Sequence, residues 1–206
     1  MVKRVEFSGD HLDVLRELMN IAVGNATASI ADLLKAFGTM HIPNITISDI
    51  KGLKQYIQET IPSQSSHYVT KQLFGGPLGG EFIFVITDEA AINLGNHLYD
   101  VDAPNDADIY DAVIELTNIL SATMISRLTE ELNVKVQFFV PSTQIIKGND
   151  LIYLEETLLY SQIIIISTQM EFQNQNINGH IFILTKDAMI QSLKDLIDQK
   201  LEELYA

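Results

Sequence analysis

The stretches DVLRELMN (residues 13–20) and DAVIELTN (residues 111–118) carry the same polar pattern. Each contains an Asp, a Glu four residues later and an Asn three residues after that. In each copy 22 residues then separate the Asn from a proline, Pro43 in the first and Pro141 in the second. The copies are offset by 98 residues at all four positions, which indicates a tandem duplication within the 206-residue chain. Both prolines are predicted to be structural.

Each stretch predicts a helix that carries one polar stripe. Successive residues of an α-helix turn by about 100°, so positions i, i+4 and i+7 fall within about 60° of one another. Apolar residues occupy much of the rest of both helices, so the stripe is either a solvated face or a presented site. The stripes hold Asp13, Glu17 and Asn20 in the first copy and Asp111, Glu115 and Asn118 in the second.

The carboxamides of Asn20 and Asn118 suggest positioning rather than acid–base chemistry. An amide does not titrate, but its acceptor oxygen and two N–H donors can hold a water molecule in a chosen direction. The glutamine of GTPases serves phosphoryl transfer in this way, and positioning contributes much of the rate in such reactions. We therefore interpret both asparagines as groups that orient a water.

The acidic members of each stripe suggest docking. Glu17 and Glu115 lie one helical turn from the asparagines and can form an ion pair with a cationic group of a partner. Asp13 and Asp111 lie one turn further away and are predicted to support the stripe. A merely solvated face is the favoured interpretation of an isolated copy, whereas two copies at one offset favour a presented site.

The composition predicts an acidic globular protein. A hydrophobic fraction of 47% and a charged fraction of 19% are typical of a packed chain. The formal net charge of −14 makes nucleic acid and anionic membranes unexpected partners and favours a partner with a basic patch. Cysteine is absent, which excludes disulfides and Cys-ligated zinc. Because neither a targeting segment nor an apolar run of about 20 residues is visible, we expect a cytoplasmic protein.

The two halves repeat the order of their predicted elements. Each reads as a long helix, three extended segments and a closing helix, and short polar turns between strands favour antiparallel pairing. We therefore predict an α+β fold: a tandem pseudo-two-fold repeat of helix-strand-strand-strand-helix, with a mainly antiparallel sheet and both motif-bearing helices on the surface. The long helices are expected at about 10–37 and 109–132, and the closing helices at 88–98 and 186–204.

Residues 1–206 are predicted to form one domain made of two repeats. The repeats span about 8–100 and 106–204, and the acidic segment 100–108, which contains Pro104, is the predicted hinge between them.

Three smaller features lead to specific expectations. Gly38 is the expected end of the first helix, and Gly24 inside that helix predicts a bend or a close helix contact. The 98-residue offset continues into the later strands, where it matches Phe84 with Phe182.

The remaining polar residues do not predict a metal or cofactor site. The five histidines are scattered without the spacing of metal ligands. The acidic segment 100–108 lacks the glycine and the terminal glutamate of an EF-hand calcium loop. The glycines at 75–80 are typical of a turn, because they do not fit a phosphate-binding loop. We therefore expect no cofactor of the chain's own.

The repeated motif resembles the signature of the CheC family of chemotaxis phosphatases. That signature is [DS]-x3-E-x2-N followed by x22-P, and both copies match it. Residues 17–26, ELMNIAVGNA, also resemble the E-I-x-N-I-x-x-G-N-A run of the family. The resemblance covers the whole chain and is strongest to members with two motifs in one chain, whereas the related CheX type carries one motif per subunit and dimerises. The second copy departs at Ala122 and Thr123, where the first has Gly24 and Asn25.

The resemblance implies a phosphatase that acts on the aspartyl phosphate of a CheY-like response regulator. In such proteins the glutamate, here Glu17 or Glu115, pairs with the regulator's active-site lysine, and the asparagine, here Asn20 or Asn118, orients the attacking water. The Mg²⁺ belongs to the regulator, and CheD, a receptor deamidase, is an implied activating partner. The alternative is a non-catalytic chemotaxis or flagellar-switch adaptor that binds CheD or a regulator. We expect both motifs to be competent.

Overall fold

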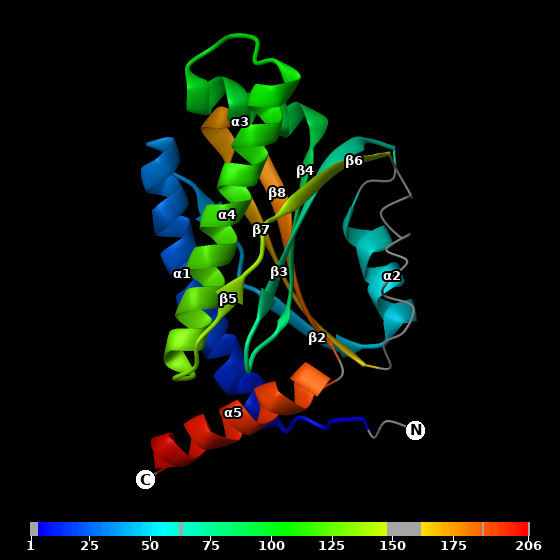
Figure 1. Cartoon of the computed structure of the whole chain (residues 1–206), viewed down its shortest axis with the longest axis vertical. Coiled ribbons are helices and arrows are strands. Elements are labelled where there is room, and N and C mark those ends of the chain that lie inside the picture. The colour runs from blue at the N-terminus through cyan, green and yellow to red at the C-terminus, as the bar shows by residue number, and fades with distance from the viewer. Residues whose placement is uncertain (1–3, 62–63, 148–161, 187, 206) are drawn as a thin grey trace.

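A computed structural model describes residues 4–61, 64–147, 162–186 and 188–205 (Figure 1). The first half contributes α1 (Gly9–Leu34), β1 (Thr39–Met40), β2 (Asn44–Ser48), α2 (Ile50–Thr60), β3 (Ser66–Gly75), β4 (Gly80–Thr87) and α3 (Asp88–Tyr99). The second half contributes α4 (Asp106–Glu131), β5 (Gln137–Phe138), β6 (Ser142–Lys147), β7 (Ile163–Phe172), the 3₁₀ turn η3 (Gln173–Gln175), β8 (Ile177–Lys186) and α5 (Ala188–Tyr205).

The eight strands of the described residues form a single antiparallel sheet. The strand order is β1-β7-β8-β4-β3-β5; β2 continues the β1 edge along β7, and β6 continues the β5 edge along β3. The edge strands of each half therefore pair with the hairpin of the other half. Exchanging β1 with β5, β7 with β3 and β8 with β4 reverses the strand order and leaves the same sheet. This symmetry confirms the predicted α+β class with its pseudo-two-fold repeat.

Two hydrophobic cores lie on opposite faces of this sheet. Helices α1 and α4 run side by side in opposite directions over one face, α2 covers the other, and α3 and α5 close the two ends (Figure 1). Fully burying a large apolar side chain contributes about 1.5–3 kcal/mol, so the larger core, under α1 and α4, dominates stability. Its fully buried side chains include Phe82, Phe84, Leu116, Leu120 and Met124. The smaller core, under α2, includes Leu53, Ile57 and Phe182.

The match of Phe84 with Phe182 is wrong by one residue. Phe84 packs in the larger core, whereas Phe182 lies in the smaller core on the other face of the sheet. Five residues separate the paired Phe74 and Gly80 in the first hairpin, but four separate the paired Phe172 and Ile177 in the second. Side chains alternate between the faces of a strand, so a turn shorter by one residue moves every following side chain to the opposite face.

The ends of the long helices differ from the sequence-based expectation. Ser8 caps α1 through a capping box, but the helix ends at Leu34, where Lys35 adopts a left-handed conformation with φ 44°. Gly38 instead permits a close approach, because a Cβ there would lie 2.3 Å from the Phe172 ring. A Cβ at Gly24 would contact nothing within 4 Å, so the predicted close helix contact is absent there.

The predicted hinge segment 100–108 is partly helical. Asn105 caps α4, which begins at Asp106 and therefore includes the last residues of that segment. The strand predicted to begin at residue 158 is described from Ile163 onward, and residues 158–161 lie outside the described part. None of the described helices has both the length and the hydropathy that a membrane crossing requires.

Two histidines on the α2 side of the sheet, His67 buried and His180 half-buried, make the free energy of unfolding depend on pH. Burial lowers the pKa of His67, and burial together with the nearby His67 and His41 lowers the pKa of His180. The unfolded chain then takes up protons near the ordinary value of 6.5 while the folded chain does not, so stability is lost as pH falls through that value. Ile163 on β7 occupies the register position that matches His67 on β3, and we predict that His67→Ile reduces this acid-induced loss. Urea unfolding at pH 7, 6 and 5 measures it; an unchanged pH slope would contradict the prediction.

Candidate functional site

Both polar stripes lie on the outer surface of the helical layer. Their two helices bury Leu15, Met19, Leu116 and Leu120 completely on the side that faces the sheet. Because α1 and α4 are antiparallel, the order Asp-Glu-Asn runs in opposite directions along the two stripes. Within the described residues no hydrogen bond or ion pair links the stripes. The exposed stripe residues are Asp13, Glu17, Asn20, Asp111 and Glu115, and Asn118 is half-buried.

The first stripe has few contacts with the rest of the protein. Arg16 Nη1 donates to Asp13 Oδ1 at 2.6 Å, and since both groups are exposed the pair contributes less than about 1 kcal/mol. In the part of the chain that the structure describes, the side chains of Glu17 and Asn20 form no hydrogen bond or ion pair. Both groups are therefore available to a partner.

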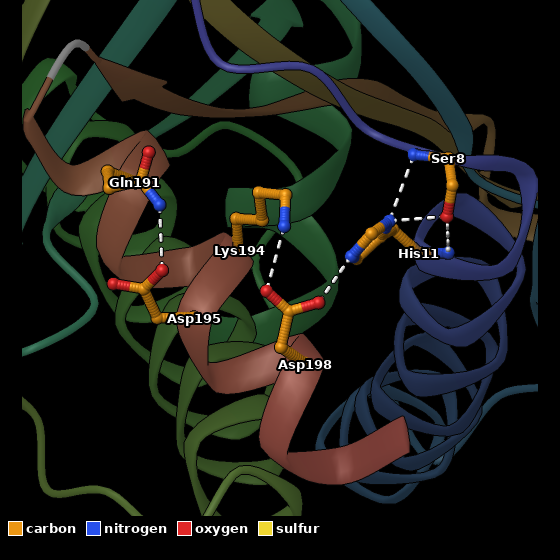
Figure 2. A network of polar contacts seen from close by, with 6 residues as sticks. All are labelled: Ser8, His11, Gln191, Lys194, Asp195 and Asp198. Atoms are coloured by element: carbon orange, nitrogen blue, oxygen red, sulfur yellow. Dashed lines mark hydrogen bonds and ion pairs between the residues drawn. The ribbon is translucent and has the colours of Figure 1, made fainter. Parts of the chain in front are cut away.

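The start of α1 is fixed against α5 by a polar network (Figure 2). The Ser8 backbone N–H donates to His11 Nδ1 at 2.9 Å, so in the neutral ring Nε2 carries the proton. His11 Nε2 lies 2.6 Å from Asp198 Oδ1, and Lys194 Nζ donates to Asp198 Oδ2 at 2.8 Å. Hydrogen bonds from Lys194 and His11 hold the pKa of Asp198 below its usual range. The network anchors the first turn of α1, two residues before Asp13.

The second stripe is connected to the sheet through Asn118. Gln72 on β3 donates from Nε2 to Asn118 Oδ1 at 3.3 Å and to the Phe139 carbonyl oxygen at 3.0 Å. The Ser121 hydroxyl, one helical turn after Asn118, donates to Gln72 Oε1. Gln72 is 6% exposed and Ser121 is fully buried. An unpaired buried polar group costs about 1–3 kcal/mol, so this network is strongly favoured over arrangements in which its hydrogen bonds are broken.

The motif prolines lie in bulges of the edge strands. Pro43 and Pro141 each end a three-residue segment, 41–43 or 139–141, that lies opposite only two residues of the neighbouring strand. One extra residue on one strand defines a β-bulge, and proline is tolerated there because it has no N–H to give to the ladder. That both prolines serve a structural purpose stays a prediction.

The bulge of the second repeat adjoins Asn118. The Phe139 carbonyl belongs to this bulge, and Gln72 bonds it and Asn118 at once. Val140, the next residue, is 91% exposed, and Ile42 in the first bulge is 84% exposed. Each bulge thus projects an apolar side chain at the surface.

Negative charge gathers along the second stripe. Tyr99, at the end of α3, has its pKa raised by partial burial and further by the charges of Asp111, Asp108 and Glu115. Within the described residues Asp111 and Glu115 form no ion pair. A cationic group of a partner protein would therefore meet carboxylates for which the described part of the chain offers no competing ion pair.

Sequence reasoning missed Gln72 and Ser121, the two side chains that hold Asn118. One signal was available: Gln72 interrupts the face of β3 on which Tyr68 and Phe74 are buried. A polar residue at such a position requires a hydrogen-bonding partner. No group of three or more potential metal ligands occurs among the residues that the structure describes.

Solved structures with this fold are flagellar and chemotaxis proteins. FliY of Thermotoga maritima superposes with a TM-score of 0.73 and 14% identity, covering 95% of this chain and 100% of that one. FliM of H. pylori, in its complex with FliG, gives 0.58 and 13%, covering 92% and 100%. CheX of Desulfovibrio desulfuricans gives 0.52 and 16%, covering 82% and 99%. No protein-family model and no curated protein sequence match the chain. These likenesses confirm the CheC-like fold that the motif implied.

Proposed function

We propose that this protein is a phosphatase for the phospho-aspartate of a CheY-like response regulator in chemotaxis signalling. The observation that carries the proposal is the pair of Asp-Glu-Asn stripes, displayed at the surface of a CheC-like fold. Among the residues that the structure describes, their Glu carboxylates are unpaired. A solvated helix face would explain one such stripe. It does not explain why the same three side chains recur, exposed or half-exposed, on both long helices.

Docking begins with the glutamates. Glu17 or Glu115 pairs with the active-site lysine of the regulator, and a charge-assisted contact of this kind fixes both the distance and the orientation of the helix. The Mg²⁺ that neutralises the phosphoryl oxygens is supplied by the regulator, so this chain needs no metal site of its own.

The chemical step uses the asparagines. The carboxamide oxygen of Asn20 or Asn118 accepts a hydrogen bond from a water molecule and turns its lone pair toward phosphorus. The new bond forms between that water oxygen and phosphorus, and the bond from phosphorus to the aspartyl oxygen breaks. The aspartate leaves as a carboxylate and the water proton goes to the released phosphate. Because a carboxylate is a good leaving group, the reaction requires no general base from this chain.

A kinetic assay tests the proposal. The regulator is phosphorylated with a small phosphodonor in the presence of Mg²⁺, and the donor is then removed. Phosphate loss from the regulator is followed with this protein at about one-tenth of the regulator's concentration. We expect faster loss in proportion to the protein added, with many turnovers per molecule, and a further increase when CheD is present. Phosphate loss at the intrinsic rate, with or without CheD, would refute it.

A non-catalytic adaptor is the second candidate. The observation that favours it is the shared fold with FliM, which has been crystallised in complex with FliG. An adaptor would bind the phosphorylated regulator or CheD without changing the rate of phosphate loss. Binding measured beside the kinetic assay therefore separates the two functions.

A further inference from the structure

We propose that Gln72 is a positioning residue for the second site: it orients the Asn118 carboxamide before any regulator binds. The proposal rests on the phosphatase function given above. Gln72 does not lie on either helix and does not contact the regulator in that mechanism. It acts through Asn118, from a strand that lies beneath α4.

The direction of the Gln72 amide is fixed by the groups around it. A backbone carbonyl can only accept, so the nitrogen of Gln72, and not its oxygen, must face Phe139 O at 3.0 Å. The oxygen of Gln72 then meets the Ser121 hydroxyl, which can donate. Both ends of the amide have the partner that their chemistry requires, and the flipped amide would place two acceptors against each other.

The fixed amide in turn fixes Asn118. The same Gln72 nitrogen lies 3.3 Å from the Asn118 side chain and needs an acceptor there, so Oδ1 faces Gln72. The terminal torsion of an asparagine is otherwise broad and nearly two-fold. One lone pair of Oδ1 and both N–H groups of Nδ2 remain for water and the regulator. The network therefore selects one of the two orientations of the carboxamide.

Burial makes the network rigid. Gln72 and Ser121 are 6% and 0% exposed, and water has little access to compete for their hydrogen bonds. Gln72 extends from β3, which pairs with β4 along most of its length. The Phe139 carbonyl is set by the bulge that contains Pro141. The strand, the bulge and the helix thus converge on one side chain.

The first repeat lacks this arrangement. The strand register makes Thr168 the counterpart of Gln72, because these two residues lie opposite the bulges 41–43 and 139–141. The residue 98 positions before Ser121 is Val23, a buried apolar side chain. The carbonyl of its bulge, His41 O, is bonded by Thr168 Oγ1 at 2.6 Å, and the Asn20 side chain has no hydrogen bond within the described residues. Asn20 must therefore be ordered by the regulator, whereas Asn118 is ordered by the protein itself.

Single-site backgrounds give the sharpest test. Asn20→Ala leaves only the second site, and Asn118→Ala leaves only the first. Gln72→Met is then added to each, because methionine keeps the volume of the side chain and removes its amide. In the Asn20→Ala background we expect kcat to fall about 10-fold with KM unchanged, since docking through Glu115 is untouched. In the Asn118→Ala background we expect Gln72→Met to leave kcat unchanged. Full activity of that double variant would also show that a chain carrying Gln72→Met folds.

Two kinetic results would overturn the assignment. An equal fall in both backgrounds would mean that Gln72→Met disturbs the whole fold rather than Asn118. No fall in the Asn20→Ala background would mean that Asn118 needs no positioning. If both single-site proteins are already inactive with Gln72 intact, the proposed function has failed instead.

A second readout does not depend on activity. The side-chain NH₂ groups of Asn20 and Asn118 are assigned by NMR in the free protein, and their order parameters are compared. We expect Asn118 to be the more ordered of the two and to approach the mobility of Asn20 in the Gln72→Met variant. Equal mobility of the two groups in the unsubstituted protein would refute the proposal whatever the kinetics show.

Discussion

Replacing both Asn20 and Asn118 with alanine is expected to abolish the acceleration of phosphate loss while the regulator still docks. In the proposed mechanism, alanine removes the group that orients the water but leaves Glu17 and Glu115 in place for the ion pair. Losing one well-placed polar group in an active site typically lowers the rate about 100-fold or more. The loss should therefore appear in kcat, with little change in the affinity for a regulator activated by a non-hydrolysable phosphate mimic. Phosphate release and binding of the mimic-bound regulator measure the two quantities separately.

A matched substitution outside the stripes is the control for this variant. Asn178 is an exposed asparagine on β8, and Asn178→Ala should leave both phosphate release and binding unchanged. If the double variant kept its full rate, the asparagines would not be the catalytic groups. If it lost binding together with rate, the asparagines would serve docking and the adaptor function would be favoured.

The elements of this fold could be predicted where the information is local. The long helices α1 and α4 follow from their apolar periodicity, and the hairpin β3–β4 follows from two apolar runs around a glycine-rich turn. Helix ends were less predictable, because Lys35 adopts a left-handed conformation that glycine would normally supply. The face to which each strand turns could not be predicted by repetition, since one residue fewer in the second hairpin reverses the assignment of Phe84 and Phe182.

The candidate site, too, could be predicted only where its residues are neighbours in the sequence. The stripe residues are neighbours on one helix, so their spacing alone places them together, and the structure leaves them exposed or half-exposed. Their roles in docking and catalysis stay predictions. Gln72 reaches Asn118 across 46 residues of sequence and Phe139 across 67, so their meeting depends on strand pairing that no local pattern specifies. The prolines become intelligible only with the register, which shows them in bulges.

The largest loss of stability is expected for Phe84→Ala in the core beneath α1 and α4. Phe84 is fully buried, and its ring lies against Gly179 of β8, where a Cβ would be only 2.5 Å from it. A glycine has no side chain that can move into the vacated space, so the cavity stays open. Phenylalanine-to-alanine changes in cores cost about 3–5 kcal/mol, and we expect a value near the upper end. Urea unfolding at neutral pH measures the free energy of unfolding.

Phe182→Ala is the matched control, because the sequence offset pairs the two positions while the structure puts them on opposite faces. Phe182 lies in the smaller core, where its ring and that of Tyr56 form a T-shaped pair with centroids 6.2 Å apart. The helix α2 can settle toward the sheet there as one unit. Large-to-small substitutions cost less where the surroundings collapse, so we expect a loss smaller than for Phe84→Ala by about 1 kcal/mol or more. Equal losses would mean that both rings occupy equivalent environments. That result would contradict the one-residue shift between the two hairpins and restore the 98-residue match in these strands.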